Sequence, residues 1–127
     1  MIVRFFLVTA AILAGLSVAI GAFSAHALKD RLSAQALTIF ETGARYQMYH
    51  ALALLLVAVL LSRAGEPPTS LVVAGFAFIA GIALFSGSLY TLSFTGISWL
   101  GAIAPIGGVA FMIGWACLAV AGWNFQQ

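Results

Sequence analysis

Few side chains in this sequence could do chemistry. Eight are candidates for a ligand-binding site or a polar network: His26, Glu41, Arg45, Tyr46, Gln47, His50, Ser86 and Tyr90. Their imidazole, carboxylate, guanidinium, amide and hydroxyl groups could pair with one another, line a path for a solute or hold a ligand. Tyr46 and His50 are one helical turn apart, so a helix would present both to the same partner.

Metal binding and catalysis are less favoured by the same residues. A metal site could use His26 and His50 with Glu41, but the two histidines lie in separate segments without a short ligand spacing. Haem ligation would need both imidazoles at similar depth on facing helices. No acidic residue lies within an apolar segment to orient a histidine against a serine. We therefore predict no catalytic residue, no metal and no other cofactor, and we expect a protein that is not an enzyme.

The elements that must position these residues are membrane-spanning helices. Hydrophobic residues make up 64% of the chain, charged residues 6%, and the mean hydropathy is +1.15, which excludes a water-soluble domain. Four apolar segments are each close to the ~20 residues that cross ~30 Å of hydrocarbon. They comprise residues 5–28, 46–62, 71–94 and 99–123. We predict an all-α integral membrane bundle of four transmembrane helices, with residues 1–127 forming a single domain.

Charged residues are too few to form a surface for nucleic acid. The formal charge of +2 comes from five basic and three acidic side chains, so we predict no nucleic-acid partner. Arg4 and Arg63 fall on one side of the predicted bundle, and Lys29, Arg31 and Arg45 on the other. This near balance does not determine the orientation in the membrane.

An amphipathic helix is predicted between the first and second spans, over residues 32–45. Its apolar residues recur on one helical face and its polar residues on the other, and Ser33 is a suitable N-cap. This helix could lie in the membrane interface, pack across the mouth of the bundle or continue directly into the second span. Glu41 and Arg45 have the i, i+4 spacing and order that favour an ion pair.

Small residues predict close packing of the first span on two sides. Ala11, Gly15 and Ala19 share one face of the predicted helix. Ser17 and Gly21 begin a second row of small residues, which ends at Ala25. Rows of this kind let helix backbones approach where lipid provides no hydrophobic drive for association.

The third span contains a polar stretch, and the fourth contains a proline that interrupts a regular helix. Ser86 and Tyr90 share a helical face, which could form a polar seam toward a cavity. Alternatively, the hydroxyl groups bond to carbonyls of their own helix or of a neighbour. Pro105 predicts a kink or local unwinding in the first third of the fourth span.

Alternating span directions place all eight candidate residues toward one end of the bundle. We expect a common pocket there, with His26 and His50 near the same leaflet and with His26, Glu41, Arg45 and His50 in a shared network. The alternative is that these side chains only pair with one another to close the bundle end. A shared network predicts that His50→Ala and Arg45→Ala lower thermal stability non-additively.

Several blocks of sequence resemble a known family. They are Gly21-Ala22-Phe23-Ser24-Ala25-His26-Ala27-Leu28, residues 42–52, residues 84–90, residues 105–109 and Gly114-Trp115. In this order they resemble domain-of-unknown-function family 423, small bacterial membrane proteins related to eukaryotic transmembrane protein 256. Ser24 and Ala27 stand where the family pattern has glycine. The resemblance implies four spans in a bacterial inner membrane and no assigned activity. The positions of greatest interest that it points to are His26, Tyr46, Gln47, His50, Ser86, Tyr90 and Pro105.

Taken together, these observations favour a small multi-pass protein of the bacterial inner membrane that acts by association. Association is favoured because the helix faces contain more glycine than the packing of a four-helix monomer needs. The partner could be a second copy, membrane lipid or a larger membrane complex. A small transporter or channel whose path passes the polar cluster is the alternative. A redox carrier that binds haem or a metal is the third hypothesis.

Overall fold

The computed structural model describes residues 1–125, which form helices and connecting turns without a strand in that range. The α-helices are α1 (Ile2–Phe23), α2 (Ala34–Arg63), α3 (Thr69–Gly81), α4 (Gly87–Thr95) and α5 (Ala104–Trp123). Two π-helical turns extend them, Ser24–Leu28 after α1 and Ile82–Ser86 between α3 and α4, and a 3-10 turn, Ser98–Ala102, precedes α5. The predicted all-α fold is confirmed.

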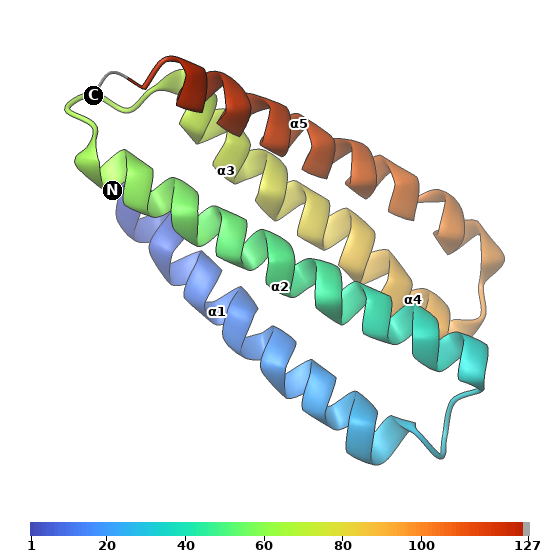
Figure 1. The fold of residues 1–127 in the computed structure, drawn as a ribbon. Helices are drawn as coiled ribbons and strands as arrows, with labels where there is room; N and C mark the ends of the chain where they lie inside the picture. The colour runs from blue at the N-terminus through green and yellow to red at the C-terminus, as the bar shows by residue number, and fades with distance from the viewer. Residues whose placement is uncertain (126–127) are drawn as a thin grey trace.

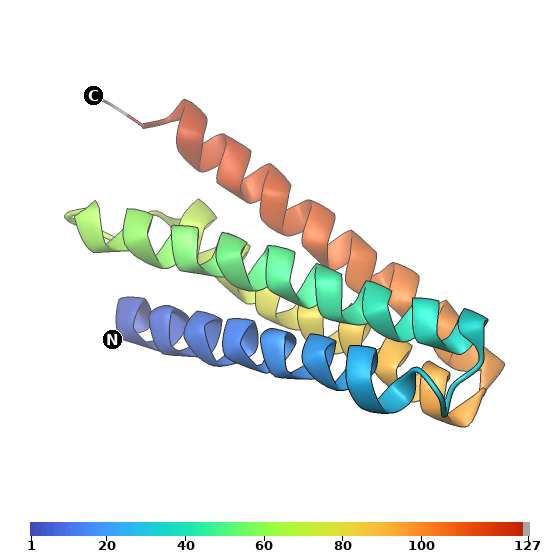
Figure 2. The same ribbon diagram turned by 60° about the horizontal axis from the view of Figure 1, so that its bottom comes forward.

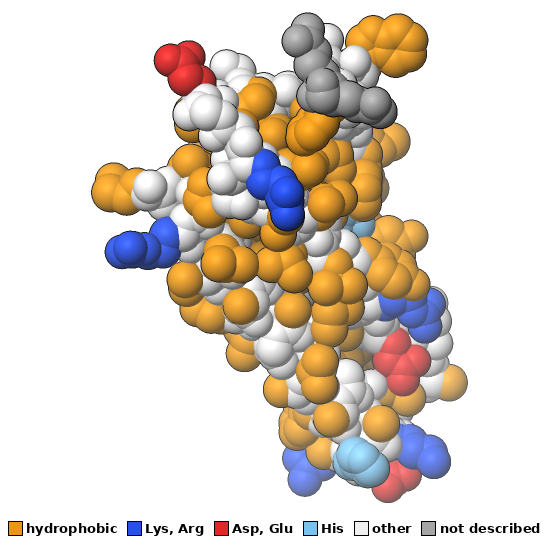
Figure 3. Space-filling view, turned by 60° about the vertical axis from the view of Figure 1, so that its left-hand side comes forward, with side chains coloured by type: hydrophobic (Ala, Val, Ile, Leu, Met, Phe, Trp, Pro, Cys, Tyr) orange, Lys and Arg blue, Asp and Glu red, His pale blue; other side chains and the backbone are white. Residues whose placement is uncertain are grey.

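Four continuous helical stretches are long and apolar enough to cross a membrane. They are Ile2–Leu28, Ala34–Arg63, Thr69–Thr95 and Ser98–Trp123. Helices satisfy their own backbone hydrogen bonds, which is what a segment in hydrocarbon requires. Hydrophobic side chains cover most of the surface between the charged groups in Figure 3. The predicted four-span architecture is therefore confirmed, and the protein is an integral membrane protein.

Consecutive spans run in opposite directions, so both termini and the connection from α2 to α3 lie at one end (Figure 1). α1 packs against α2, α5 packs against α3, and α2 also packs against α3 and α4. In a second view α5 diverges from α2 toward the C-terminus (Figure 2). In the most apolar part of each span, the buried share is 17% in the first span and 22% in the fourth. It is 50% in the second span and 39% in the third. The two outer helices therefore face lipid over most of their surface.

Aromatic rings and glycines form the closest contacts between the spans. Phe6 of α1 lies against Gly75 of α3, and Phe78 of α3 lies against Gly114 of α5. Both rings are fully buried. A side chain at either glycine would occupy the space of the facing ring, so the absence of a side chain there is what lets the ring fit.

The predicted amphipathic segment is the beginning of α2 and not a separate interfacial helix. Ser33 caps α2, as predicted, because its hydroxyl accepts a hydrogen bond from the backbone N–H of Ala36 at 3.1 Å. The helix then continues without a break to Arg63. Of the three placements left open by the sequence, direct continuation into the second span is the one observed.

The position of α2 in the membrane follows from its two arginines. Arg45 and Arg63 are 18 residues apart and both exposed, which corresponds to about 27 Å along the helix axis. That length is close to the ~30 Å of the hydrocarbon core. A membrane position that puts the two guanidinium groups at opposite interfaces would leave the part of α2 before Arg45 in the headgroup region.

Pro105 lies at the start of α5. The preceding 3-10 turn ends at Ala102, and α5 begins at Ala104, with the proline in its first turn. At this position the missing N–H of proline removes no hydrogen bond of the helix. The predicted interruption therefore exists, but it precedes the proline and does not kink the helix that contains it.

Candidate functional site

A chain of hydrogen bonds through Gln47 connects three helices. The phenol of Tyr90 in α4 donates to Gln47 Oε1 at 2.7 Å, and Gln47 Nε2 donates to the carbonyl of Leu13 in α1 at 2.8 Å. Only 4% of the surface of Gln47 is exposed. A buried amide without partners would be costly in a membrane interior, so these two bonds fix the relative positions of the helices.

Two serine hydroxyls reinforce the same region. Ser17 Oγ in α1 donates to the carbonyl of Ala44, and Ser86 Oγ donates to the carbonyl of Gly43, both at 2.7 Å. Each carbonyl has two lone pairs, so it can accept these bonds in addition to its own helical bond. Ser86 therefore bonds to a neighbouring helix, which is one of the two arrangements that the sequence left open.

His50 is held by both of its ring nitrogens. Nδ1 lies 2.7 Å from the carbonyl of Tyr46, and Nε2 lies 3.1 Å from the indole nitrogen of Trp115 in α5. An indole N–H can only donate, so Nε2 accepts and the ring hydrogen lies on Nδ1. The imidazole also stacks on Phe111, with ring centroids 3.5 Å apart. A metal or haem iron at Nε2 would have to displace the indole.

The side chains of His50 and Trp115 are expected to be energetically coupled through their hydrogen bond. His50→Ala and Trp115→Phe should each lower stability, and the double variant should lose about 1 kcal/mol less than the sum. The measurement is thermal unfolding in detergent micelles. His50→Ala with Arg45→Ala is the matched control and should be additive, because Arg45 is exposed and the hydrogen bonds of His50 are to Tyr46 and Trp115. Additivity of the first pair would contradict the observed contact.

The structure does not bring His26 together with His50. His26 is exposed in the π-helical turn after α1. Two residues earlier, Ser24 Oγ donates to Glu41 Oε1 at 3.2 Å, which places this turn beside the first part of α2. His50 follows Glu41 by nine residues, about 14 Å further along the helix axis. The two imidazoles therefore do not share a pocket, because His50 lies deeper, although this separation still fits within one half of a ~30 Å hydrocarbon core.

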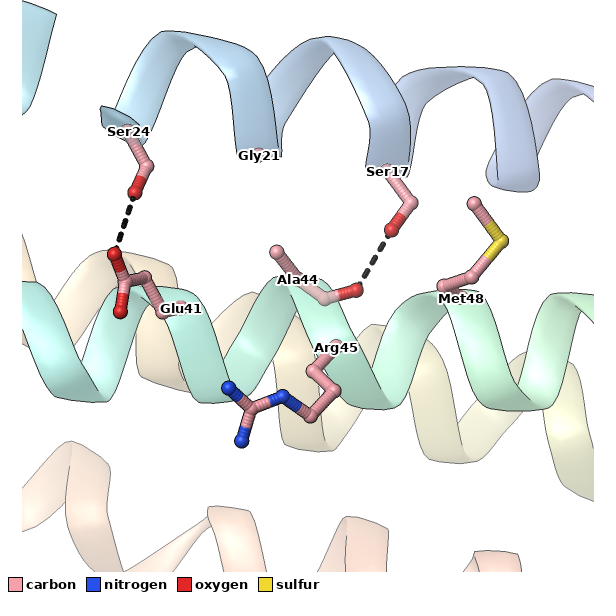
Figure 4. A pocket seen from close by; sticks show the side chains of 7 residues that line it. All are labelled: Ser17, Gly21, Ser24, Glu41, Ala44, Arg45 and Met48. Atoms are coloured by element: carbon pink, nitrogen blue, oxygen red, sulfur yellow. Dashed lines mark hydrogen bonds between the residues drawn. The ribbon is translucent and has the colours of Figure 1, made fainter. Parts of the chain in front are cut away.

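The charged residues lie outside the buried cluster. Glu41 and Arg45 are exposed, and the carboxylate of Glu41 is directed toward Ser24 while the side chain of Arg45 extends away from α1 (Figure 4). Glu41 thus pairs with Ser24 and not with Arg45. Tyr46 is also partly exposed and packs its ring against Phe85, with centroids 4.8 Å apart.

Six of the eight predicted residues therefore divide into two groups. Gln47, His50, Ser86 and Tyr90 form the buried bonds between helices, and Glu41 and Arg45 line a groove on the surface. His26 and the Tyr46 ring belong to neither. Within residues 1–125, no group of three histidine, cysteine, aspartate or glutamate side chains could hold a metal ion. Every buried side-chain nitrogen or oxygen in that range also has a hydrogen-bond partner.

The groove lies between α1 and α2 and is open to the side of the bundle (Figure 4). Its volume is about 340 Å³. The lining residues come from both helices and combine small, polar and charged side chains: Ser17, Gly21, Ser24, Glu41, Ala44, Arg45 and Met48. A Cβ atom added to Gly21 would meet no other atom within 4 Å, so this glycine leaves open space in the groove.

Sequence reasoning missed Ser17, Ser24 and Trp115 as functional candidates. The two serines follow each other at a spacing of seven residues with Gly21 midway between them, which is a polar row as well as a row of small residues. Trp115 could have been noticed because an indole N–H within an apolar span needs an acceptor. The sequence offers no signal that the acceptor would be His50.

Comparisons with known proteins agree with this architecture. The family described as "Protein of unknown function (DUF423)" matches residues 20–108. The UPF0382 membrane protein YwdK of Bacillus subtilis is 49% identical over 125 residues, covering 96% of this chain and 98% of its own. The UPF0382 membrane protein SAB0533 of Staphylococcus aureus is 43% identical over 122 residues, covering 96% and 98%. No solved structure matches the chain.

Proposed function

Because this chain belongs to the DUF423 family of membrane proteins without an assigned activity, we propose that it acts without catalysis, by lateral association within the membrane. The partner occupies the groove between α1 and α2. The observation that carries the proposal is the contrast between an interior whose polar groups already bond to one another and a polar groove that opens sideways.

The interior of the bundle supports this proposal. A solute path or a catalytic centre needs polar groups that are free to bind the solute or the substrate. Gln47 uses its amide nitrogen and oxygen to connect α1 and α4, and His50 uses both ring nitrogens. These side chains therefore hold the helices together, which is the structural alternative recognised for them in the sequence.

The groove supports the proposal from outside. It is bordered by α1, whose most apolar part is mostly unburied, so a molecule that diffuses in the bilayer can reach it directly. Charged side chains at a lipid-accessible surface are costly in hydrocarbon unless they lie at the interface or find a partner. Glu41 and Arg45 lie at the level where both conditions can be met.

Gly21→Leu tests this association, with Gly15→Leu as the matched control. Both glycines lie on α1, and an added Cβ meets nothing within 4 Å at either position, but only Gly21 lines the groove. Native mass spectrometry of protein extracted with its native membrane should detect a retained lipid or protein partner in the wild type and in Gly15→Leu. We expect Gly21→Leu to lose that partner. Equal retention by all three proteins would refute association through the groove.

Proteoliposomes test the alternative function as a transporter or channel. We expect no increase in the flux of protons, potassium ions or small anions over empty liposomes, because the buried polar side chains already have hydrogen-bond partners within residues 1–125. A flux that rises with protein content and changes in Gln47→Leu would instead establish a path through the bundle.

A further inference from the structure

We propose that the groove between α1 and α2 binds a phospholipid whose headgroup carries both a phosphate and a primary ammonium, the chemistry of phosphatidylethanolamine. This inference rests on the proposed lateral association and identifies its partner. It follows from the charges of the groove, their order along the membrane normal and the kinds of side chain that line it.

One cation and one anion line the groove a single helical turn apart. Glu41 and Arg45 are four residues apart on α2, which places their Cβ atoms about 5–6 Å from each other. The Glu41 carboxylate accepts one hydrogen bond, from Ser24. A carboxylate has about four acceptor positions, so it can accept an ammonium as well. Arg45 offers a planar guanidinium, which binds phosphate through paired N–H groups. Its side chain extends away from α1 in Figure 4, so it must turn about its rotatable bonds toward the groove to meet the phosphate.

The order of these groups matches the order of groups in a phospholipid. Glu41 is nearest the end of the bundle, Arg45 is one turn deeper, and Met48 lies about one further turn toward the membrane centre. In an ethanolamine phospholipid the ammonium is at the outer end, the phosphate follows, and the acyl chains point into the membrane. The ammonium therefore meets Glu41, the phosphate meets Arg45, and the acyl region passes Met48.

The lining residues also discriminate among headgroups. Quaternary ammonium groups are recognised by aromatic side chains, and the residues that line this groove include no aromatic ring. A primary ammonium instead donates hydrogen bonds, which a carboxylate and a serine hydroxyl accept. A headgroup with a phosphate and no cation would leave Glu41 opposed to the negative charge. The groove therefore favours ethanolamine over choline or glycerol headgroups.

Lipid exchange followed by native mass spectrometry tests this assignment. The purified full chain is incubated with mixed micelles of phosphatidylethanolamine, phosphatidylcholine and phosphatidylglycerol with identical acyl chains. We expect the wild type to retain the ethanolamine lipid preferentially. Arg45→Gln should lower the retention of ethanolamine lipid about tenfold, because it removes a charge-assisted contact with the phosphate. Arg63→Gln, a substitution of an exposed arginine at the other end of α2, is the matched control and should change nothing.

Glu41→Gln separates ammonium recognition from phosphate recognition. The amide oxygen can still accept the hydrogen bond from Ser24, so the groove keeps its shape, but the preference for ethanolamine over choline should disappear. The reversed pair Glu41→Arg with Arg45→Glu keeps the net charge and inverts the order, so it should also lose the ethanolamine lipid. Thermal unfolding of each variant confirms that it is folded, as expected for substitutions at exposed positions.

Three results would overturn the assignment. Equal retention of the three lipids, preferential retention of phosphatidylglycerol, or an ethanolamine preference that survives Glu41→Gln would each show that the headgroup is not recognised as stated. The proposed function is judged separately by Gly21→Leu. If that variant loses a retained partner while the three lipids bind alike, lateral association stands and only the headgroup assignment fails. If it loses nothing, both fail.

Discussion

Gly107→Ala is expected to lower the free energy of unfolding by about 3 kcal/mol, a large effect for the addition of one methyl group. An added Cβ would lie 2.7 Å from Phe85 Cβ and 2.8 Å from Phe85 Cα, and closer still to the Phe85 backbone nitrogen. Backbone atoms of a helix cannot rotate aside as a flexible side chain can, so α5 would have to move away from the π-helical turn Ile82–Ser86. That movement would also weaken the contact from Trp115 to His50.

Gly108→Ala provides the control for this substitution. It adds the same methyl group one residue later on α5, where a Cβ meets no atom within 4 Å. Replacing glycine by alanine at such a site should leave stability unchanged or raise it slightly. Thermal unfolding in the same micelles compares the two variants, and similar stabilities would mean that α5 does not pack as described.

Gln47→Leu is expected to lower the free energy of unfolding by about 2 kcal/mol. Leucine has a similar size, so the change removes the polar contacts without leaving a large cavity. It leaves the Tyr90 hydroxyl without its acceptor, at a cost of about 1–3 kcal/mol if no other partner is found. The Leu13 carbonyl loses its additional bond but keeps its helical one. Hydrogen bonds between membrane helices average only about 0.6 kcal/mol, which limits the sum to the lower part of that range.

A double-mutant cycle with Tyr90→Phe identifies the cause of that loss. Tyr90→Phe removes only the hydroxyl, and it should cost clearly less in a Gln47→Leu background than in the wild type. Steric trapping or thermal unfolding supplies the free energies. If the two losses simply add, the hydrogen bond between Tyr90 and Gln47 does not contribute to stability.

The four spans could be predicted from the sequence because the length of apolar segments and the positions of charged residues limit where a chain can cross hydrocarbon. The start of α2 was also predicted, from Ser33 as an N-cap, but whether the helix continues unbroken into the second span was left open. A change from amphipathic to apolar composition at Tyr46 marks where the membrane begins, and it does not mark where the helix begins, which is Ala34. His50 lies deeper than His26 because it follows the polar beginning of α2, whereas His26 lies just before the charged residues 29–31 that end the first span.

The candidate site was predictable in part. Gln47, His50, Ser86 and Tyr90 are polar residues in apolar spans, and such residues need partners, so their importance follows from their surroundings. Their partners could not be deduced, because the contact from His50 to Trp115 joins residues 65 positions apart and depends on how α5 packs. The groove was missed because its hydroxyls lie on α1, where Ser17 and Gly21 were interpreted only as small residues.

The π-helical turn Ile82–Ser86 divides the third span into two halves with different phases. A residue gained within one helical turn rotates all later side chains by about 100° relative to a regular α-helix. Before the turn, Gly75 and Phe78 meet α1 and α5. Ser86 at the end of the turn and Tyr90 after it meet α2. A one-residue deletion there would make the helix more regular and yet uncouple it from α2. Chain length in this segment is therefore under tighter constraint than its plain apolar composition suggests.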